Sequence, residues 1–214
     1  MTTAAQLEAK ARAGESLAGI ALMQLDLRGA DLRGVDLSGA TLLAVDLRGT
    51  LLAGANLSGA SLMSCDLEGA TLADAVLSEA RFANCRLTRA SLAGARLAGV
   101  TLWRCDLGPA VFDRMDLSRV VLAGSKLRGA SFRAAALVDA NLDQAELAGA
   151  DFSDARIERT SLSSADLSRS RLCGAHVEES AFADSNPSRR CSRRISCGGR
   201  WRNSSRTRRS ANST

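Results

Sequence analysis

Side chains that commonly carry out chemistry are scarce in this sequence. His176 is the only histidine, tyrosine is absent, and no Gly-rich phosphate loop or nucleophile motif is present. Cys65, Cys85 and Cys105 recur at every twentieth position, a spacing that suggests either a metal or redox ladder or buried packing. Packing is the favoured interpretation, because cysteines within an apolar shell are usually inert thiols. We therefore predict no catalytic, cofactor-binding or metal site, and a protein that is not an enzyme.

A row of charged residues with the same spacing of twenty is a second candidate for a functional feature. Six of its eight members are acidic: Asp26, Asp46, Asp66, Arg86, Asp106, Lys126, Glu146 and Asp166. Like charges stacked at about 5 Å repel each other. However, Arg28, Arg48 and Arg128 lie two residues further along the chain. We interpret the row as a solvated, partly paired charge ladder.

These spacings are multiples of an internal repeat of five residues. Every fifth position from Leu17 to Phe182 is Leu, Phe, Ile or Val, and a smaller series, often Ala, precedes it by two residues. A period of five fits neither a helix nor a flat strand, but it fits a short extended segment followed by a corner. Four corners, and therefore four repeats, close one coil. Stacking the coils at about 4.8 Å predicts a rod on the order of 40 Å long.

The repeat also has a recognisable signature. Residues 30–34 read Ala-Asp-Leu-Arg-Gly and residues 55–59 read Ala-Asn-Leu-Ser-Gly. This A(D/N)LXX pattern resembles the pentapeptide-repeat family, over about residues 17–184. The resemblance implies an all-β fold, a right-handed quadrilateral parallel β-helix with both apolar series inside. It says much less about function.

The corners of the coils provide a further test. Between residues 17 and 184, 14 of 15 glycines lie two residues after the large apolar residue, where a type II turn needs a positive φ. Bulkier residues replace glycine at many corners after Gly69, so we expect other turn types over residues 74–119. At Pro109 a positive φ is excluded. We expect a local distortion there, as a splayed corner rather than a functional loop.

The two ends differ. Residues 1–16 are predicted to form a capping helix on the β-helix of residues 17–185. A capping box begins at Thr3, Leu7 and Ala11 share a face, and Gly14 is a stop signal. The tail, residues 186–214, is Arg/Ser-rich and predicted to be disordered.

The basic tail dominates the net charge of +5. Residues 1–185 carry 19 Lys and Arg against 23 Asp and Glu, whereas residues 186–214 carry nine Arg and no acid. The tail is either a nucleic-acid or anionic-surface contact, or an out-of-frame extension, which is the interpretation we favour. Cys191 and Cys197 supply too few ligands for zinc.

We expect a cytoplasmic protein, since no Sec-type leader and no apolar stretch of membrane-spanning length is evident. The favoured function is a non-enzymatic scaffold or protein-interaction module that binds another protein through an outer face. A link to a bacterial secretion accessory system is suggested by the resemblance of residues 7–19 to the lead-in of such domains. The alternative is a DNA-mimicking inhibitor or protector of gyrase, of the fluoroquinolone-resistance type. Nucleic-acid binding through the tail is a third hypothesis.

Overall fold

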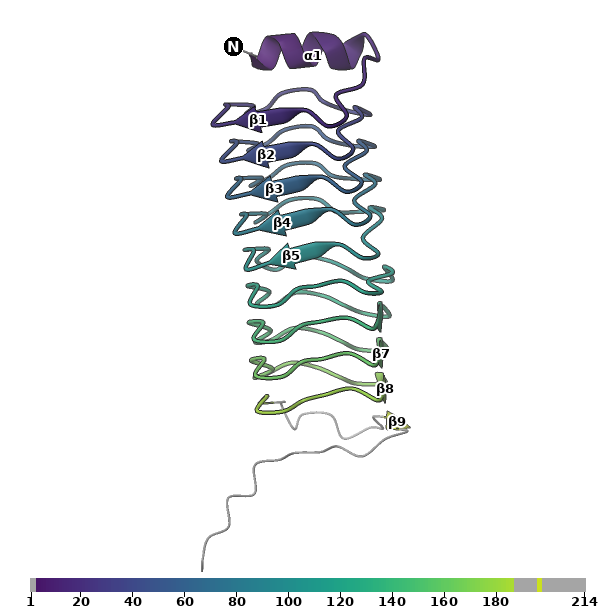
Figure 1. Ribbon diagram of the computed structural model, residues 1–214. Coiled ribbons are helices and arrows are strands. Elements are labelled where there is room, and N and C mark those ends of the chain that lie inside the picture. The colour runs from purple at the N-terminus through teal and green to yellow at the C-terminus, as the bar shows by residue number, and fades with distance from the viewer. Residues whose placement is uncertain (1–2, 187–195, 198–214) are drawn as a thin grey trace, which may run out of the picture.

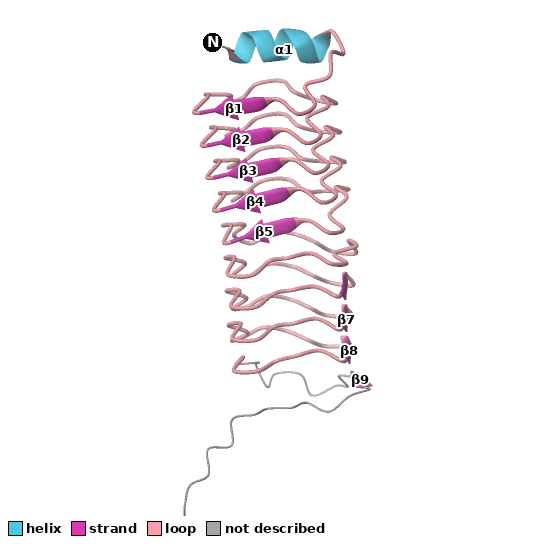
Figure 2. Cartoon of the chain, viewed as in Figure 1, coloured by secondary structure: helices cyan, strands magenta, loops and turns pink. Residues whose placement is uncertain are grey.

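The computed structural model describes residues 3–186 together with Ser196 and Cys197. Its elements form a stack beneath one short helix (Figures 1 and 2). They are α1 (Ala4–Arg12), β1 (Ala21–Met23), β2 (Thr41–Leu43), β3 (Ser61–Met63), β4 (Arg81–Ala83), β5 (Thr101–Trp103), β6 (Ala136–Val138), β7 (Arg156–Glu158), β8 (His176–Glu178) and β9 (Ser196–Cys197).

All strand pairing is parallel and follows one register. Leu22 pairs with Leu42, and Leu42 pairs with Leu62, so each coil contains four of the five-residue repeats. Strands β1–β5 form one sheet and β6–β9 form another on a different side of the rod (Figure 1). Isolated bridges with the same spacing join the other sides. The predicted solenoid is confirmed, with about eight turns.

The interior is built from the two apolar series. Nearly all of the large residues and most of the small ones are buried, and together they form one continuous core. The ring centroids of Phe112 and Phe132 are 5.0 Å apart, and those of Phe132 and Phe152 are 4.7 Å apart. These stacked rings, one coil apart, form an aromatic ladder inside the rod. Because leucine and alanine fill most of the narrow core, it needs few aromatic residues.

Helix α1 lies across the first coil (Figure 1). The predicted capping box is present, since Thr3 Oγ1 accepts the amide of Gln6 and Gln6 Oε1 accepts that of Thr3. Leu7 belongs to the buried core, and Glu8 Oε1 accepts the backbone amide of Asp31 at 2.9 Å. The helix thus covers apolar surface and satisfies a polar backbone group at this end of the solenoid.

The prediction of other turn types over residues 74–119 was wrong at Asp74, Glu79, Arg89 and Arg114, where both the positive φ and the turn hydrogen bond are kept. Positive φ values of 51° to 60° occur at the corners that lost glycine, which are Asp74, Glu79, Asn84, Arg89, Arg104 and Arg114. The physical reason is that corner side chains project outward from the coil. The cost of a left-handed residue, about 1–2 kcal/mol, is opposed by hydrogen bonds between successive coils. Glycine is favoured at these corners but not required.

The hydrogen bonding of the turns, unlike their φ values, differs between the sides of the rod. At most corners the amide after the turn donates to the carbonyl three residues back, as from Ala30 to Leu27 at 3.1 Å. Within the described chain this bond is absent after each of strands β1–β5. Small polar side chains replace it in part. Ser125 Oγ donates to the carbonyl of Leu102 at 2.6 Å and accepts the amide of Cys105 at 2.9 Å.

The cysteine ladder lies at these open corners. Cys65, Cys85 and Cys105 are free and buried, as the packing interpretation predicts. Each thiol also contacts a carbonyl oxygen of the preceding coil, for example Cys85 Sγ with that of Leu62 at 3.4 Å. The adjacent Cys85 thiol and burial raise the pKa of Cys65 well above its ordinary value. The Cys65 thiol is therefore protonated and unreactive at neutral pH.

The predicted distortion at Pro109 is present. Gly108 takes the positive φ one residue early, and the usual turn hydrogen bond after Leu107 is absent from the described chain. On the two sides that follow, no backbone hydrogen bond is recorded between described residues 90–97 and 110–117. The coils join again at Gly99, whose amide donates to Ser118 at 2.9 Å. We call this local gap in the ladder the Pro109 seam.

At the far end of the stack, Asn186 donates from Nδ2 to Asp166 and accepts the amide of Leu167 at 2.7 Å. Strand β9 lies within the segment for which disorder was predicted, and it pairs with β8 in the same register as the other strands. Apart from Asn186, Ser196 and Cys197, the predicted tail lies outside the described residues. Cys191 and all nine arginines of the tail belong to this part. In the described part of the chain, no helix has the length and apolar composition that crossing a bilayer requires.

Candidate functional site

The charged row is a partly paired ladder, as predicted. Arg28 lies 2.6 Å from Asp26 and 3.6 Å from Asp46 of the next coil, and Arg48 pairs in the same way with Asp46 and Asp66. Hydrogen bonds from Arg28 lower the pKa of Asp26 to about 2. The cations therefore neutralise much of the negative field along this side of the rod.

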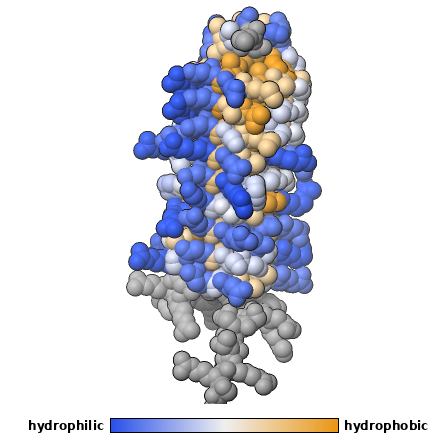
Figure 3. All heavy atoms as spheres, turned by 60° about the vertical axis from the view of Figure 1, so that its left-hand side comes forward, coloured by the Kyte–Doolittle hydropathy of each residue, from blue (hydrophilic) through white to orange (hydrophobic). Residues whose placement is uncertain are grey.

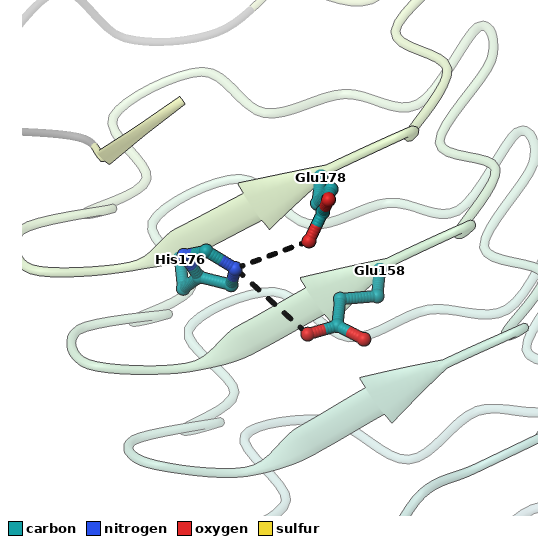
Figure 4. A group of neighbouring side chains, drawn as sticks. All are labelled: Glu158, His176 and Glu178. Carbon is teal, nitrogen blue, oxygen red and sulfur yellow. Dashed lines mark ion pairs between the residues drawn. The ribbon is translucent and has the colours of Figure 1, made fainter. Parts of the chain in front are cut away.

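Glu158, His176 and Glu178 form a cluster on strands β7 and β8 (Figure 4). His176 lies on the outer surface, with Nε2 3.8 Å from Glu158 Oε1 and 3.4 Å from Glu178 Oε2. These three atoms lie close enough to share a metal ion. However, the Arg156 guanidinium already hydrogen-bonds both oxygens of Glu158 and lowers its pKa. The cluster is best described as an ion-pair network that a metal would have to disrupt.

An apolar surface lies on the β1–β5 face, defined as the outward residues of these strands and the corner residue after each. Met23, Leu43, Met63 and Trp103 are 65%, 37%, 48% and 40% exposed, and they occupy the same position in successive or nearby coils. They are four of the six large apolar side chains exposed in the described chain. Figure 3 shows a hydrophobic band with hydrophilic flanks in the upper part of the rod. Contiguous exposed apolar surface is typical of an interaction site.

The charge of the β1–β5 face is also one-sided. It carries no acidic residue, and Arg81 and Arg104 are its only charged side chains. Every other side of the rod carries acids within the first six coils. The outward residues of coils one to three on this face are uncharged, so the face changes from apolar to cationic along the rod.

A notch of about 540 Å³ adjoins the cationic end of this face. We call it the basic notch. Its lining residues are Asn84, Cys85, Arg86, Arg104, Asp106, Gly124, Lys126 and Gln144.

Two features shape the basic notch. The Arg104 guanidinium lies 4.4 Å from the centroid of the Trp103 ring. The Cγ atom of Arg104 would lie 3.2 Å from a Cβ placed on Gly124. Glycine at the sixth coil therefore leaves room for the arginine side chain.

Three of the lining residues are cations and only Asp106 is an acid. Among the described residues neither Arg104 nor Lys126 forms an ion pair, so the notch keeps a positive excess.

The β1–β5 face was missed by the sequence reasoning. The five-residue period directs attention to the inward positions, whereas this face emerges only when outward residues are compared one coil apart. Met23, Leu43 and Met63 then align with Trp103, and the missing acids become evident. That signal was present in the sequence.

These features define a four-sided solenoid with a five-residue repeat and one distinctive outer face. The pentapeptide repeat family model matches the chain in eight overlapping copies that extend from residue 16 to residue 186. The chain belongs to the pentapeptide repeat family, as its resemblance implies. No curated protein matches the sequence significantly.

Solved structures share the fold. A trypsin-treated variant of QnrB1, a plasmid-mediated fluoroquinolone resistance protein, is 20% identical with a TM-score of 0.63, covering 82% of this chain and 88% of its own. HetL from Nostoc sp. strain PCC 7120, involved in heterocyst differentiation regulation, is 28% identical over 86% of this chain and 97% of its own, with a TM-score of 0.31. Alr5209 from Nostoc PCC 7120 is 36% identical over 49% of this chain and 80% of its own, with a TM-score of 0.41. At this identity the QnrB1 likeness extends to the fold alone.

Proposed function

We propose that the protein is a non-enzymatic interaction rod that binds another protein through its β1–β5 face. The observation that supports this function is the row of Met23, Leu43, Met63 and Trp103, exposed on a face without acids. Placing such side chains in water is unfavourable by about 25 cal/mol per Å² of apolar surface. A partner that covers the row removes this cost. Because the fold is stabilised by its interior, these outward side chains are free to serve binding.

Site-specific photo-cross-linking in the source organism tests the proposal. A photoreactive amino acid at position 63 should cross-link one partner protein, whereas the same group at Ala93, exposed on another side, should not. The additional substitution Leu43→Glu should abolish the cross-link, because it places a charge within the apolar row. The proposal fails if no protein cross-links at position 63, or if positions 63 and 93 capture the same protein equally.

The DNA-mimic alternative has less physical support. A DNA mimic needs a continuous negative surface, but the most acidic row of this rod is paired with Arg28 and Arg48. The likeness to QnrB1 carries no argument beyond the fold. We expect the purified protein to leave gyrase supercoiling unchanged at micromolar concentration. Inhibition or protection of gyrase at that concentration would favour the alternative instead.

Two other hypotheses depend on different parts of the chain. The link to a bacterial secretion accessory system rests on residues 7–19 and remains a prediction, for which the genes that neighbour the coding sequence are the relevant observation. Nucleic-acid binding by the tail predicts salt-sensitive affinity that disappears when residues 186–214 are deleted.

A further inference from the structure

The β1–β5 face offers side chains but no free strand edge along its length. Strands β2, β3 and β4 each pair on both sides. Beyond β5, Thr101 bridges to Val121 of the next coil, and α1 lies over the first coil. A partner therefore cannot add a strand between these coils. A segment whose backbone hydrogen bonds are satisfied internally, as in an α-helix, suits such a surface.

The spacing of the apolar row also matches a helix. Successive coils are about 4.8 Å apart, and one turn of an α-helix rises about 5.4 Å. One apolar side chain per helical turn can therefore contact each coil in succession. The distance from Met23 to Trp103 covers four coil steps, about 19 Å, which corresponds to about 13 residues of helix.

The cationic side chains at one end of the apolar row indicate which groups a bound helix would need at that end. Arg81 and Arg104 lie on the fourth and fifth coils, and the basic notch adds Arg86 and Lys126 beside them. Arg86 is paired with Glu68 at 2.9 Å, but Arg104 and Lys126 make no ion pair within the described chain. Apolar contacts at the first three coils and acidic groups at the notch would complement this surface.

From these features we infer that the partner's contact segment is an amphipathic α-helix with an acidic end. Its apolar side lies along Met23, Leu43 and Met63, and its carboxylates lie over the basic notch. The inference rests on the proposed function and specifies the partner's chemistry. Arg104 is held against Trp103 before binding, so part of the ordering that an ion pair requires is already complete.

A pair of synthetic helical peptides provides the probe. The first spans about four helical turns, with leucines at i, i+3, i+4 and i+7 and three glutamates in its first turn. The second replaces the three glutamates with glutamines. Binding of the rhodamine-labelled peptides to the full chain is measured by fluorescence anisotropy. We expect the glutamate peptide to bind at least tenfold more tightly in 50 mM NaCl, with the difference shrinking in 500 mM NaCl because salt screens exposed charges.

Two sets of variants locate the interaction. Arg104→Glu with Lys126→Glu should remove or reverse the preference for the glutamate peptide. Arg133→Glu, a charge reversal at an exposed position on another side, should leave it unchanged. Leu43→Ser with Met63→Ser should weaken both peptides about equally. Circular dichroism melting of each variant verifies that the solenoid is intact.

Equal affinity for the two peptides, no binding of either at millimolar concentration, or a preference that survives the double charge reversal would overturn the inference. The cross-linking at position 63 separates this failure from that of the proposed function. A partner that still cross-links there in a Leu43-dependent manner, while the peptides are not discriminated, would leave the interaction rod standing without the acidic helix.

Discussion

At nearly every corner of the solenoid, the second residue takes a positive φ whether or not it is glycine. Gly54 and Ala134 occupy such corners on the same side of the rod, with φ values of 67° and 54°. Both corners have the turn hydrogen bond, at 3.0 and 3.1 Å. A Cβ placed on Gly54 would meet no atom within 4 Å. Glycine and alanine at these corners should therefore differ in stability only through the cost of a positive φ, and not through side-chain contacts.

Reciprocal substitutions measure that difference. We expect Gly54→Ala to lower the free energy of unfolding by about 1 kcal/mol and Ala134→Gly to raise it by up to a similar amount. Urea denaturation followed by circular dichroism gives both values. Changes of the same sign in the two variants would show that contacts, rather than φ, determine the choice of residue.

The thiols of Cys65 and Cys85 are predicted to resist modification. The hydrogen bond with the Cys85 thiol and burial raise the pKa of Cys65, and the hydrogen bond with the Cys105 thiol and burial raise the pKa of Cys85 to about 12, which leaves almost no thiolate at pH 7. We expect less than a tenth of each site to react with iodoacetamide within an hour in the native protein, and complete reaction in 6 M guanidinium. Site-resolved mass spectrometry checks this. Rapid native labelling at Cys85 would contradict the packing interpretation.

Cys105 provides an internal comparison. The hydrogen bond with the Cys85 thiol lowers its pKa, so Cys105 is protected by its burial rather than by a raised pKa. Any slow native labelling should therefore appear at Cys105 before it appears at Cys65. The opposite order would show that access, and not the thiol pKa, sets the rate.

Among the elements, the Pro109 seam is where we expect the stack to open most readily. Amides on most coils donate to the next coil, as from Leu72 at 2.8 Å and Leu77 at 3.0 Å. The corresponding amides of Leu92 and Leu97 have no such bond within the described chain. We expect Leu92 and Leu97 to exchange hydrogen at least tenfold faster than Leu72 and Leu77 in native-state hydrogen–deuterium exchange.

Replacement of the proline tests the cause. Pro109→Gly restores an amide and permits a positive φ at the corner, so it should slow exchange at Leu92 and Leu97 toward the rate at Leu72. Fast exchange that persists in this variant would assign the seam to other residues, such as the partly buried Met115.

For the molecule as a whole, the inward positions made the fold predictable. The positions from Leu17 to Phe182 define the period, which indicates short extended segments joined by corners around a narrow core, and the family resemblance implies four sides. The conformations at Asp74 and Arg89 were not predictable from residue preference, because coil-to-coil hydrogen bonds outweigh a local cost of about 1–2 kcal/mol. The cluster at His176 escaped prediction because it depends on side-chain rotamers. The β1–β5 face could have been predicted, since the coil length alone aligns Met23 with Trp103.

The paired aspartates predict how the stability of the whole rod depends on pH. Arg28 lowers the pKa of Asp26 to about 2, and Arg33 does the same for Asp31. A carboxylate whose pKa is lower in the folded state stabilises the fold above its unfolded pKa, and this contribution disappears as the pH falls through the folded pKa. We therefore expect the melting temperature to be constant from pH 7 to 5 and to fall between pH 4 and 2. Asp26→Asn should reduce the size of that fall, whereas Asp74→Asn, at a residue without an ion pair in the described chain, should not. A fall of equal size in the wild type and the Asp26 variant would mean that the ladder does not contribute to stability.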